Sequence, residues 1–354
     1  MKFSTGIRML AFVLASLAAG AAVAKEPPRI VILATGGTIA GAQPKEGEPG
    51  YKAGSLSIGS LISAAPGIDD LARITGEQIA SIGSQDMNDA VWLELAKRTN
   101  ELLDDSMVDG VVVTHGTDTL EETAYFLSLV VDSDKPLVLV GSMRPATSTS
   151  PDGPLNLFNA VAVAADPGAK GRGVMVVSND DLFAAREIQK TNTTDLQTFV
   201  APNRGPVGEV YYGKPWYFGV PATRHTVNSE FSLDGVTKLP RVDIVYAHQN
   251  ADGALIEAAV AAGAKGIVLA GVGDGNASRS MVDALAAAAK SGVLVVRSSR
   301  VGSGIVRRNI EIDDDELGFV AALELNPQKA RVLLRLALLK TKSADDVQRM
   351  FREY

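Results

Sequence analysis

The chain has 354 residues, of which 46% are apolar and 21% charged; these proportions exclude a disordered or fibrous protein, and the length predicts two domains. Its 34 Lys and Arg against 41 Asp and Glu give a net charge of −7, which argues against nucleic acid as a partner because phosphate binding needs clustered cations. The sequence has no cysteine and only three histidines, so disulfides, thiol nucleophiles and cysteine-based zinc sites are excluded and we expect no metal.

Residues 1–24 predict a secretory signal peptide. Lys2 and Arg8 form a basic start, an uncharged apolar run follows, and Ala22-Val23-Ala24 is a small-residue cleavage motif. The run is short and rich in Ala and Gly for a membrane span, which needs ~20 apolar residues, so cleavage is favoured over an uncleaved anchor. We therefore expect an exported protein that is cleaved after Ala24 and free of the membrane.

Short apolar runs rich in branched side chains predict the strands of parallel sheets, because strands buried on both faces have this composition. These runs are residues 29–35, 110–115, 136–141, 173–178, 242–248, 266–271 and 292–298.

Helical patterns lie between the predicted strands. Val91, Leu95 and Leu102 recur at helical spacing, and residues 121–131 follow the second strand. Asn326-Pro327 predicts the start of a last helix, with Val332, Leu336 and Leu339 on one face.

This alternation predicts an α/β fold with right-handed crossovers. Residues 211–239 interrupt it with prolines, aromatics and polar side chains. We expect a larger N-terminal α/β domain with a mostly parallel sheet at residues 25–215, a linker at 216–240, and a smaller C-terminal flavodoxin-like domain with a parallel sheet at 241–354.

Loops that follow two of these strands present hydroxyls beside glycines, where ligands bind in open α/β sheets. Residues 35–41 (TGGTIAG) follow the first strand, and residues 114–119 (THGTDT) follow the second. Glycine lets backbone N–H groups approach an oxyanion or a carboxylate closely. A nucleotide site is disfavoured because neither a G-x-G-x-x-G nor a Gly-Lys-Ser/Thr motif is present. The Gly- and Pro-rich residues 41–54 are a candidate lid.

Without cysteine, a nucleophile has to be Ser, Thr, Lys or a carboxylate. A Thr hydroxyl needs a base, and a buried Lys can serve. Lys190, within residues 186–195 (REIQKTNTTD), is the one Lys embedded in a run of hydroxyl and amide side chains.

The two Gly-rich motifs, TGGTIAG and GVVVTHGTDTLEETAYF, resemble the signatures of the bacterial L-asparaginase family. The resemblance extends over the mature chain and favours the periplasmic, type II branch. Further matching segments are GEQIASIGSQDMND, VGSMRP, KTNTTD, AGVGDGN, VVRSSRV and NPQKARVLL.

The resemblance implies that Thr38 is the nucleophile that attacks the side-chain amide carbon. Tyr51 in the lid contacts Thr38. Thr117, Asp118 and Lys190 form a second cluster, in which the Lys eases deprotonation of the Thr hydroxyl. Whether Thr117 activates water or only stabilises charge is open at this level.

Substrate binding is implied for a further set of residues. Ser84 and Gln85, with Thr117 and Asp118, would hold the α-carboxylate and α-ammonium of the substrate. The resemblance implies that Glu311 and the supporting amide of Asn276 come from a neighbouring subunit. It also implies a tetramer of intimate dimers and neither metal nor other cofactor.

Each of these residues also has a structural alternative. Thr38 could cap the following segment, Asp118 could cap the helix after it, and Glu311 could belong to a solvated acidic face with the neighbouring aspartates. His115 is interpreted as a hydrogen-bonded structural residue, and Met87 and Trp92 as core.

Substrate preference follows from two positions. Members of the family active on both amides tend to carry Glu at the place of Gln85 and Ser at that of Asn276, so this pair indicates L-asparagine as preferred substrate. Residues 216–231 (WYFGVPATRHTVNSEF) resemble the dual-specificity members more closely, and Asp274 stands where Asn is usual, so we also expect some L-glutaminase activity. The competing hypothesis is a periplasmic amino-acid-binding protein of two α/β domains that does not react with its ligand. An amidase or lactonase on the same fold is a third.

Overall fold

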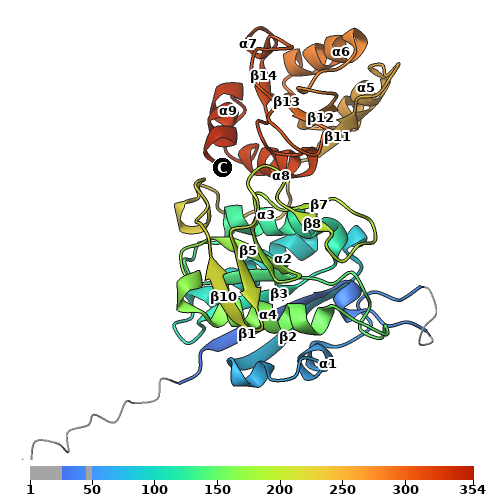
Figure 1. Cartoon of the computed structure of the whole chain (residues 1–354). Coiled ribbons are helices and arrows are strands. Elements are labelled where there is room, and N and C mark those ends of the chain that lie inside the picture. The colour runs from blue at the N-terminus through green and yellow to red at the C-terminus, as the bar shows by residue number, and fades with distance from the viewer. Residues whose placement is uncertain (1–25, 45–49) are drawn as a thin grey trace, which may run out of the picture.

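A computed structural model describes residues 26–44 and 50–354 (Figure 1). The predicted signal peptide lies outside the described residues, as do residues 45–49 of the expected lid. The chain forms two α/β domains, a larger one built on an eight-stranded, mostly parallel sheet and a smaller one built on a four-stranded, all-parallel sheet. The predicted fold class is confirmed.

The larger sheet has the strand order β10-β9-β6-β5-β4-β3-β1-β2. Five of its strands are parallel: β1 (Arg29–Gly36), β2 (Arg73–Ile82), β3 (Gly110–Thr114), β4 (Leu137–Val140) and β5 (Val174–Ser178). Antiparallel strands complete one edge: β6 (Asp181–Ala184), β9 (Gly208–Tyr211) and β10 (Lys214–Tyr217). A separate two-stranded sheet joins β7 (Gln189–Lys190) to β8 (Phe199–Val200).

Helices cover both faces of this sheet because successive side chains of the central strands point to opposite faces. Val31 and Leu33 of β1 pack with α2 (Asp89–Asp104) and α3 (Leu120–Val130) in one core. Ile30 and Ile32 pack in a second core with α1 (Ile58–Ser63) and α4 (Gly153–Ala165). The uninterrupted apolar run of β1 therefore serves two cores.

The smaller domain repeats this plan. Its strands are β11 (Val242–Tyr246), β12 (Gly266–Gly271), β13 (Leu294–Ser299) and β14 (Phe319–Ala321). Its helices are α5 (Ala254–Ala261), α6 (Arg279–Lys290), α7 (Asp314–Leu317), α8 (Pro327–Ala337) and α9 (Ala344–Glu353).

Helix α8 lies between the two domains and packs against α3 (Figure 1). Asn326 caps it as predicted, accepting from Lys329 N at 3.1 Å. Val332 and Leu336 are buried, but Leu339 lies beyond the end of the helix and is 38% exposed, so its assignment to the buried face is wrong.

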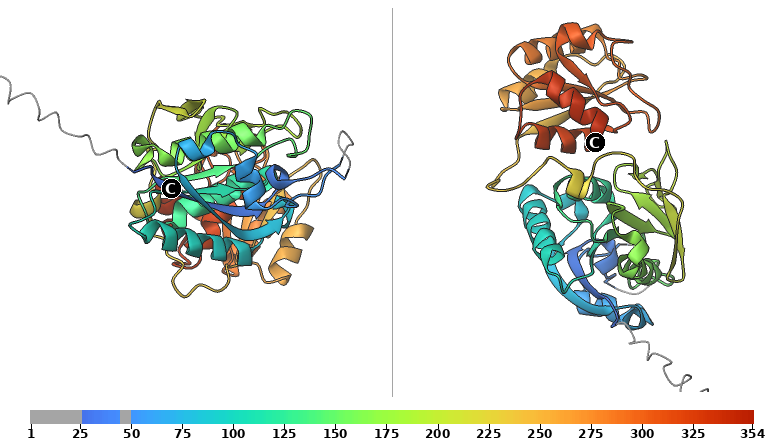
Figure 2. Two further views of the ribbon diagram at one scale, coloured as in Figure 1. Left: turned by 90° about the horizontal axis from the view of Figure 1, so that it is seen from below. Right: turned by 90° about the vertical axis from the view of Figure 1, so that its left-hand side faces the viewer.

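Two lobes are visible in Figure 2, and the chain crosses between them after β10. The segment expected to link the domains begins at residue 216, so its first two residues belong to β10 of the larger sheet. Within the part of the chain that the structure describes, no helix is both long and apolar enough to cross a membrane.

Candidate active site

The two Gly-rich loops meet at the carboxyl edge of the larger sheet. Strands β1 and β3 are parallel neighbours in which Ala34 pairs with Thr114, so both loops leave the sheet at the same edge. Gly37 has a φ of +81°, and a Cβ on it would lie 2.3 Å from the backbone nitrogen of Gly116. Only glycine allows this approach, which brings the adjacent residues Thr38 and Thr117 together.

Thr38 is buried, and its hydroxyl is within hydrogen-bonding distance of one other side chain. Its Oγ1 lies 2.7 Å from Oη of Tyr51, which is 46% exposed. Ala42 and Lys52 exchange two backbone hydrogen bonds, so the described ends of the expected lid fold back on each other. The 3-10 turn η1 (Thr38–Ala40) is preceded by Gly37, and no side chain caps it. The structure thus gives Thr38 a partner in the lid, without a capping role at η1.

A second cluster is formed by Lys190, Thr117 and Asp118. Lys190 Nζ donates to Thr117 Oγ1 at 2.9 Å and to Asp118 Oδ1 at 2.7 Å. Thr117 is buried, whereas the Asp118 side chain is 59% exposed. Such a solvated ion pair adds little to stability. The residue before α3 is Thr119, so Asp118 does not cap that helix.

Ser84 connects a third loop to this cluster. It begins the turn η3 (Ser84–Asp86) after β2, which pairs with β1 on the side away from β3. The backbone N–H of Asp118 donates to Ser84 Oγ at 3.2 Å, and Thr119 Oγ1 donates to Ser84 O at 2.8 Å. Gln85 is exposed and lies 3.4 Å from Asp86 Oδ2. The structure therefore gathers the predicted residues of the larger domain at one sheet edge.

Asn276 and Glu311 lie in the smaller domain and contact each other. Asn276 Nδ2 donates to Glu311 Oε2 at 3.0 Å. Among residues 26–44 and 50–354, no hydrogen bond or ion pair joins either of them to Thr38, Thr117 or Lys190. Within one chain, this pair is therefore not hydrogen-bonded to those three residues.

The loops that carry this pair are held by a buried guanidinium. Arg297 is fully buried and donates to both carboxylate oxygens of Asp314 at 2.6 Å. It also donates to the carbonyls of Asp274, Gly275 and Arg307 at 3.1–3.2 Å. The loop before Asn276 and the loop around Glu311 are therefore fixed to the same side chain.

His115 has a structural role, in line with its interpretation from the sequence. It is fully buried, with Nδ1 2.7 Å from Gly116 O and Nε2 2.9 Å from Thr123 Oγ1. Trp92 Nε1, also buried, donates to the same hydroxyl. Burial lowers the pKa of His115 to about 4, so the ring is neutral at pH 7 and Nδ1–H donates to the Gly116 carbonyl. The ring therefore fixes the backbone at Gly116, next to Thr117, and is not exposed to solvent.

The site combines the hydroxyls of Thr38 and Thr117 with the amine of Lys190. A hydroxyl attacks a carbonyl when its proton can leave, and an amine that donates to a hydroxyl, as Lys190 donates to Thr117, can stabilise negative charge on that oxygen. Of the residues that the structure describes, no three His, Cys, Asp or Glu side chains form a group that could hold a metal ion. Nothing in the sequence singles out Glu121, a buried carboxylate that accepts from the backbone N–H of Lys190 at 2.8 Å.

Comparison with known proteins matches the chain to two family models. Residues 29–222 match "Asparaginase, N-terminal", and residues 241–351 match "Glutaminase/Asparaginase C-terminal domain". "L-asparaginase 2" of Escherichia coli is 52% identical over 95% of each chain. "Probable L-asparaginase periplasmic" of Haemophilus influenzae is 52% identical over 94% of each chain. A "Glutaminase-asparaginase" of Pseudomonas fluorescens is 47% identical over 92% of this chain and 90% of its own.

The fold also matches a solved structure. "Probable Cytoplasmic L-asparaginase" from Campylobacter jejuni superposes with a TM-score of 0.90 at 47% identity and covers 92% of this chain and 100% of its own.

Proposed function

The chain belongs to the asparaginase family, and from that premise we propose that it hydrolyses the side-chain amide of L-asparagine to give L-aspartate and ammonia, with some activity on L-glutamine. Relatives named L-asparaginase and glutaminase-asparaginase support both parts of this proposal. The observation that carries it is the meeting of Thr38 and the Lys190–Thr117–Asp118 cluster across the Gly37–Gly116 contact.

Thr38 is the proposed nucleophile. Its Oγ1 bonds to the amide carbon while the carbonyl electrons move to oxygen, and backbone N–H groups of the Gly-rich loops meet the oxyanion. Collapse of this intermediate breaks the C–N bond, and the nitrogen leaves as ammonia after gaining a proton. Water then attacks the ester on Thr38, releasing aspartate and returning the proton to the hydroxyl. Tyr51 Oη, 2.7 Å from Thr38 Oγ1, is placed to exchange that proton.

Thr117, Asp118 and Lys190 form the proposed second catalytic group. An ammonium that donates to Thr117 Oγ1 lowers the cost of negative charge on that oxygen. Asp118 accepts from the same ammonium and so keeps Lys190 directed at Thr117. In this arrangement, Thr117 Oγ1 can accept a proton from the attacking water or stabilise the oxyanion.

The proposed substrate carries both an α-carboxylate and an α-ammonium group, so the site must bind a negative and a positive charge. Ser84, Gln85 and Thr117 offer donors for the α-carboxylate, and Asp118 offers an acceptor for the α-ammonium. Glu311, with Asn276, completes the cation site from a neighbouring subunit. In support, neither residue is hydrogen-bonded to Thr38, Thr117 or Lys190 among the described residues of one chain. We therefore propose a homotetramer, a dimer of dimers with sites at the intimate interface. The sequence of residues 1–24 and the Haemophilus relative's name support a periplasmic location.

Ammonia release separates this proposal from an amino-acid-binding protein. The purified protein is incubated with L-asparagine or L-glutamine in excess EDTA, and ammonia is measured by a coupled assay. Release from asparagine that is faster than from glutamine and insensitive to EDTA is expected. Binding of asparagine without ammonia release would refute the proposal, and rescue by a divalent ion would refute its metal-free mechanism.

A further inference from the structure

Strand β7, which presents Lys190, receives no support from the main sheet. It has two residues and, among the described strands, pairs only with β8, which is equally short. A lysine side chain is flexible, so the ammonium stays on Thr117 and Asp118 only if the Lys190 backbone is fixed by other contacts. Those contacts come from α3 and from the start of α8 in the smaller domain.

Glu121, in the first turn of α3, makes the first of these connections. Its side chain is 3% exposed. Oε2 accepts from the backbone N–H of Lys190 at 2.8 Å. Oε1 accepts from Asn326 Nδ2 at 3.0 Å and from Gln328 Nε2 at 2.7 Å. One buried carboxylate thus joins the strand of Lys190 to the first turn of α8.

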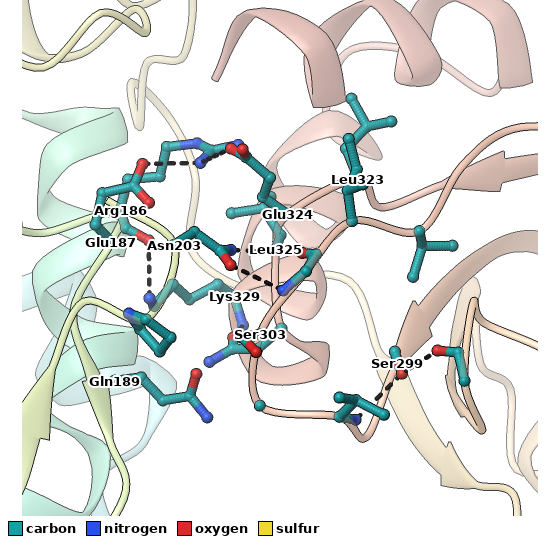
Figure 3. A pocket seen from close by; sticks show the side chains of 18 residues that line it. Arg186, Glu187, Gln189, Asn203, Ser299, Ser303, Leu323, Glu324, Leu325 and Lys329 are labelled. Carbon is teal, nitrogen blue, oxygen red and sulfur yellow. Dashed lines mark hydrogen bonds and ion pairs between the residues drawn. The ribbon is translucent and has the colours of Figure 1, made fainter. Parts of the chain in front are cut away.

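Lys329 makes the second connection, one residue further along α8. It is also 3% exposed, and its Nζ donates to Arg186 O at 2.8 Å and to Ile188 O. Figure 3 shows this side chain extending from α8 toward the backbone beside Glu187. The stretch that leads into Lys190 is therefore held by α8 directly as well as through Glu121.

We propose that Glu121 is a positioning residue for Lys190, and that through it and Lys329 the smaller domain sets the Lys190 ammonium against Thr117 within the same chain. This rests on the proposed catalytic role of Lys190. It gives the smaller domain a part in the chemistry of its own chain's site, separate from that of Glu311.

Three donors converge on Glu121, and this explains why the residue is a carboxylate. An ionised carboxylate accepts from all three, whereas glutamine of nearly the same volume has one oxygen and must turn its NH₂ group toward a donor. The Gln328 amide could rotate to accept from this NH₂ group, but Asn326 could not, because its Oδ1 already accepts from the N–H of Lys329. Glu121→Gln therefore loses the contact with either Lys190 N or Asn326 and leaves a buried donor facing another donor. A displacement of Lys190 by ~1 Å can cost up to about 10²-fold in rate.

The test is a double-mutant cycle with steady-state kinetics on asparagine. Glu121→Gln is expected to lower kcat by about 10- to 100-fold with KM changed less than about twofold. The double variant Glu121→Gln/Lys190→Ala is expected to be no slower than Lys190→Ala alone, because a positioning residue has nothing left to position. Glu122→Gln is the matched control. Glu122 is the next residue of α3 and lies 4.0 Å from Arg331 of α8, so its variant should keep wild-type kcat.

The inference would be overturned if Glu121→Gln lowered kcat by the same factor in the wild-type and Lys190→Ala backgrounds. It would also be overturned if folded Glu121→Gln kept wild-type kcat. If Lys190→Ala itself keeps wild-type kcat, the proposed role of Lys190 fails and the inference falls with it, which is a separate result from the first two. Should Glu121→Gln not fold by circular dichroism, Lys329→Met replaces it in the same cycle. Its loss of kcat should again vanish in the Lys190→Ala background, and an additive loss would refute the proposal.

Discussion

Replacing Gly37 by alanine should pull apart the two loops that form the site. Gly37 has φ +81° and ψ −173°, a conformation that only glycine adopts readily and that costs other residues about 1–3 kcal/mol. The new Cβ would lie 2.3 Å from Gly116 N and 2.4 Å from its Cα, so reaching an ordinary contact requires a separation of about 1 Å. Overpacking of this kind costs about 1–3 kcal/mol more.

Gly37→Ala should therefore lower the free energy of unfolding by about 2–6 kcal/mol and kcat by about 10²-fold, since Thr38 is moved away from Thr117. Gly171→Ala is the matched control: its φ is +74°, but a Cβ there meets no atom within 4 Å, so the expected loss is only about 1–2 kcal/mol with unchanged kcat. Urea denaturation and ammonia release measure the two quantities. If Gly37→Ala and Gly171→Ala had the same free energy of unfolding and the same kcat, the close contact between Gly37 and Gly116 would not be what holds the two loops in place.

Three further outcomes are expected from other parts of the molecule. Arg297→Met should lower the free energy of unfolding by about 3–5 kcal/mol in urea denaturation, because Asp314 is left charged and buried; a loss under about 1 kcal/mol would contradict this. Burial lowers the pKa of His115 to about 4 while the unfolded chain binds its proton near 6.5, so stability present above pH 6.5 is lost as pH falls toward 4. His115→Gln should remove about 2 kcal/mol of the stability difference between pH 7.5 and pH 5, and an unchanged difference would argue for another group. Refolding a mixture of Thr38→Ala and Glu311→Ala should give mixed dimers with one intact site and activity above either parent at low asparagine; no gain in mixed dimers confirmed by native mass spectrometry would place Glu311 in its own chain's site.

Most of the strands predicted from the sequence, such as β1 and β3, are buried on both faces, and their apolar runs are uninterrupted. β2 escaped this reasoning. It is an edge strand in which every residue is partly or fully exposed, and it includes the polar Glu77 and Gln78. β10 is short, antiparallel and contains Pro215, so it resembled a loop.

The site divides in the same way. The loops that hold Thr38 and Thr117 could be located from the residues alone, because each follows a recognisable strand end and contains glycine. The family resemblance then singled out these two hydroxyls among the others in the loops. Ser84 follows the unrecognised β2, so only the family resemblance pointed to it. Glu121 could not be found, because nothing in the sequence distinguishes it from Glu122, and only tertiary packing brings one of the two against Lys190.

The identity of the nucleophile is tested most directly by kcat of Thr38→Ala at saturating asparagine, measured beside Thr38→Ser. We expect a fall of about 10³-fold or more for the alanine variant with an unchanged circular dichroism spectrum, because residual binding cannot replace an attacking hydroxyl. The serine variant, which keeps a hydroxyl at this position, should retain more activity. A fall of less than about tenfold for Thr38→Ala would show that another group attacks the amide and would contradict the mechanism.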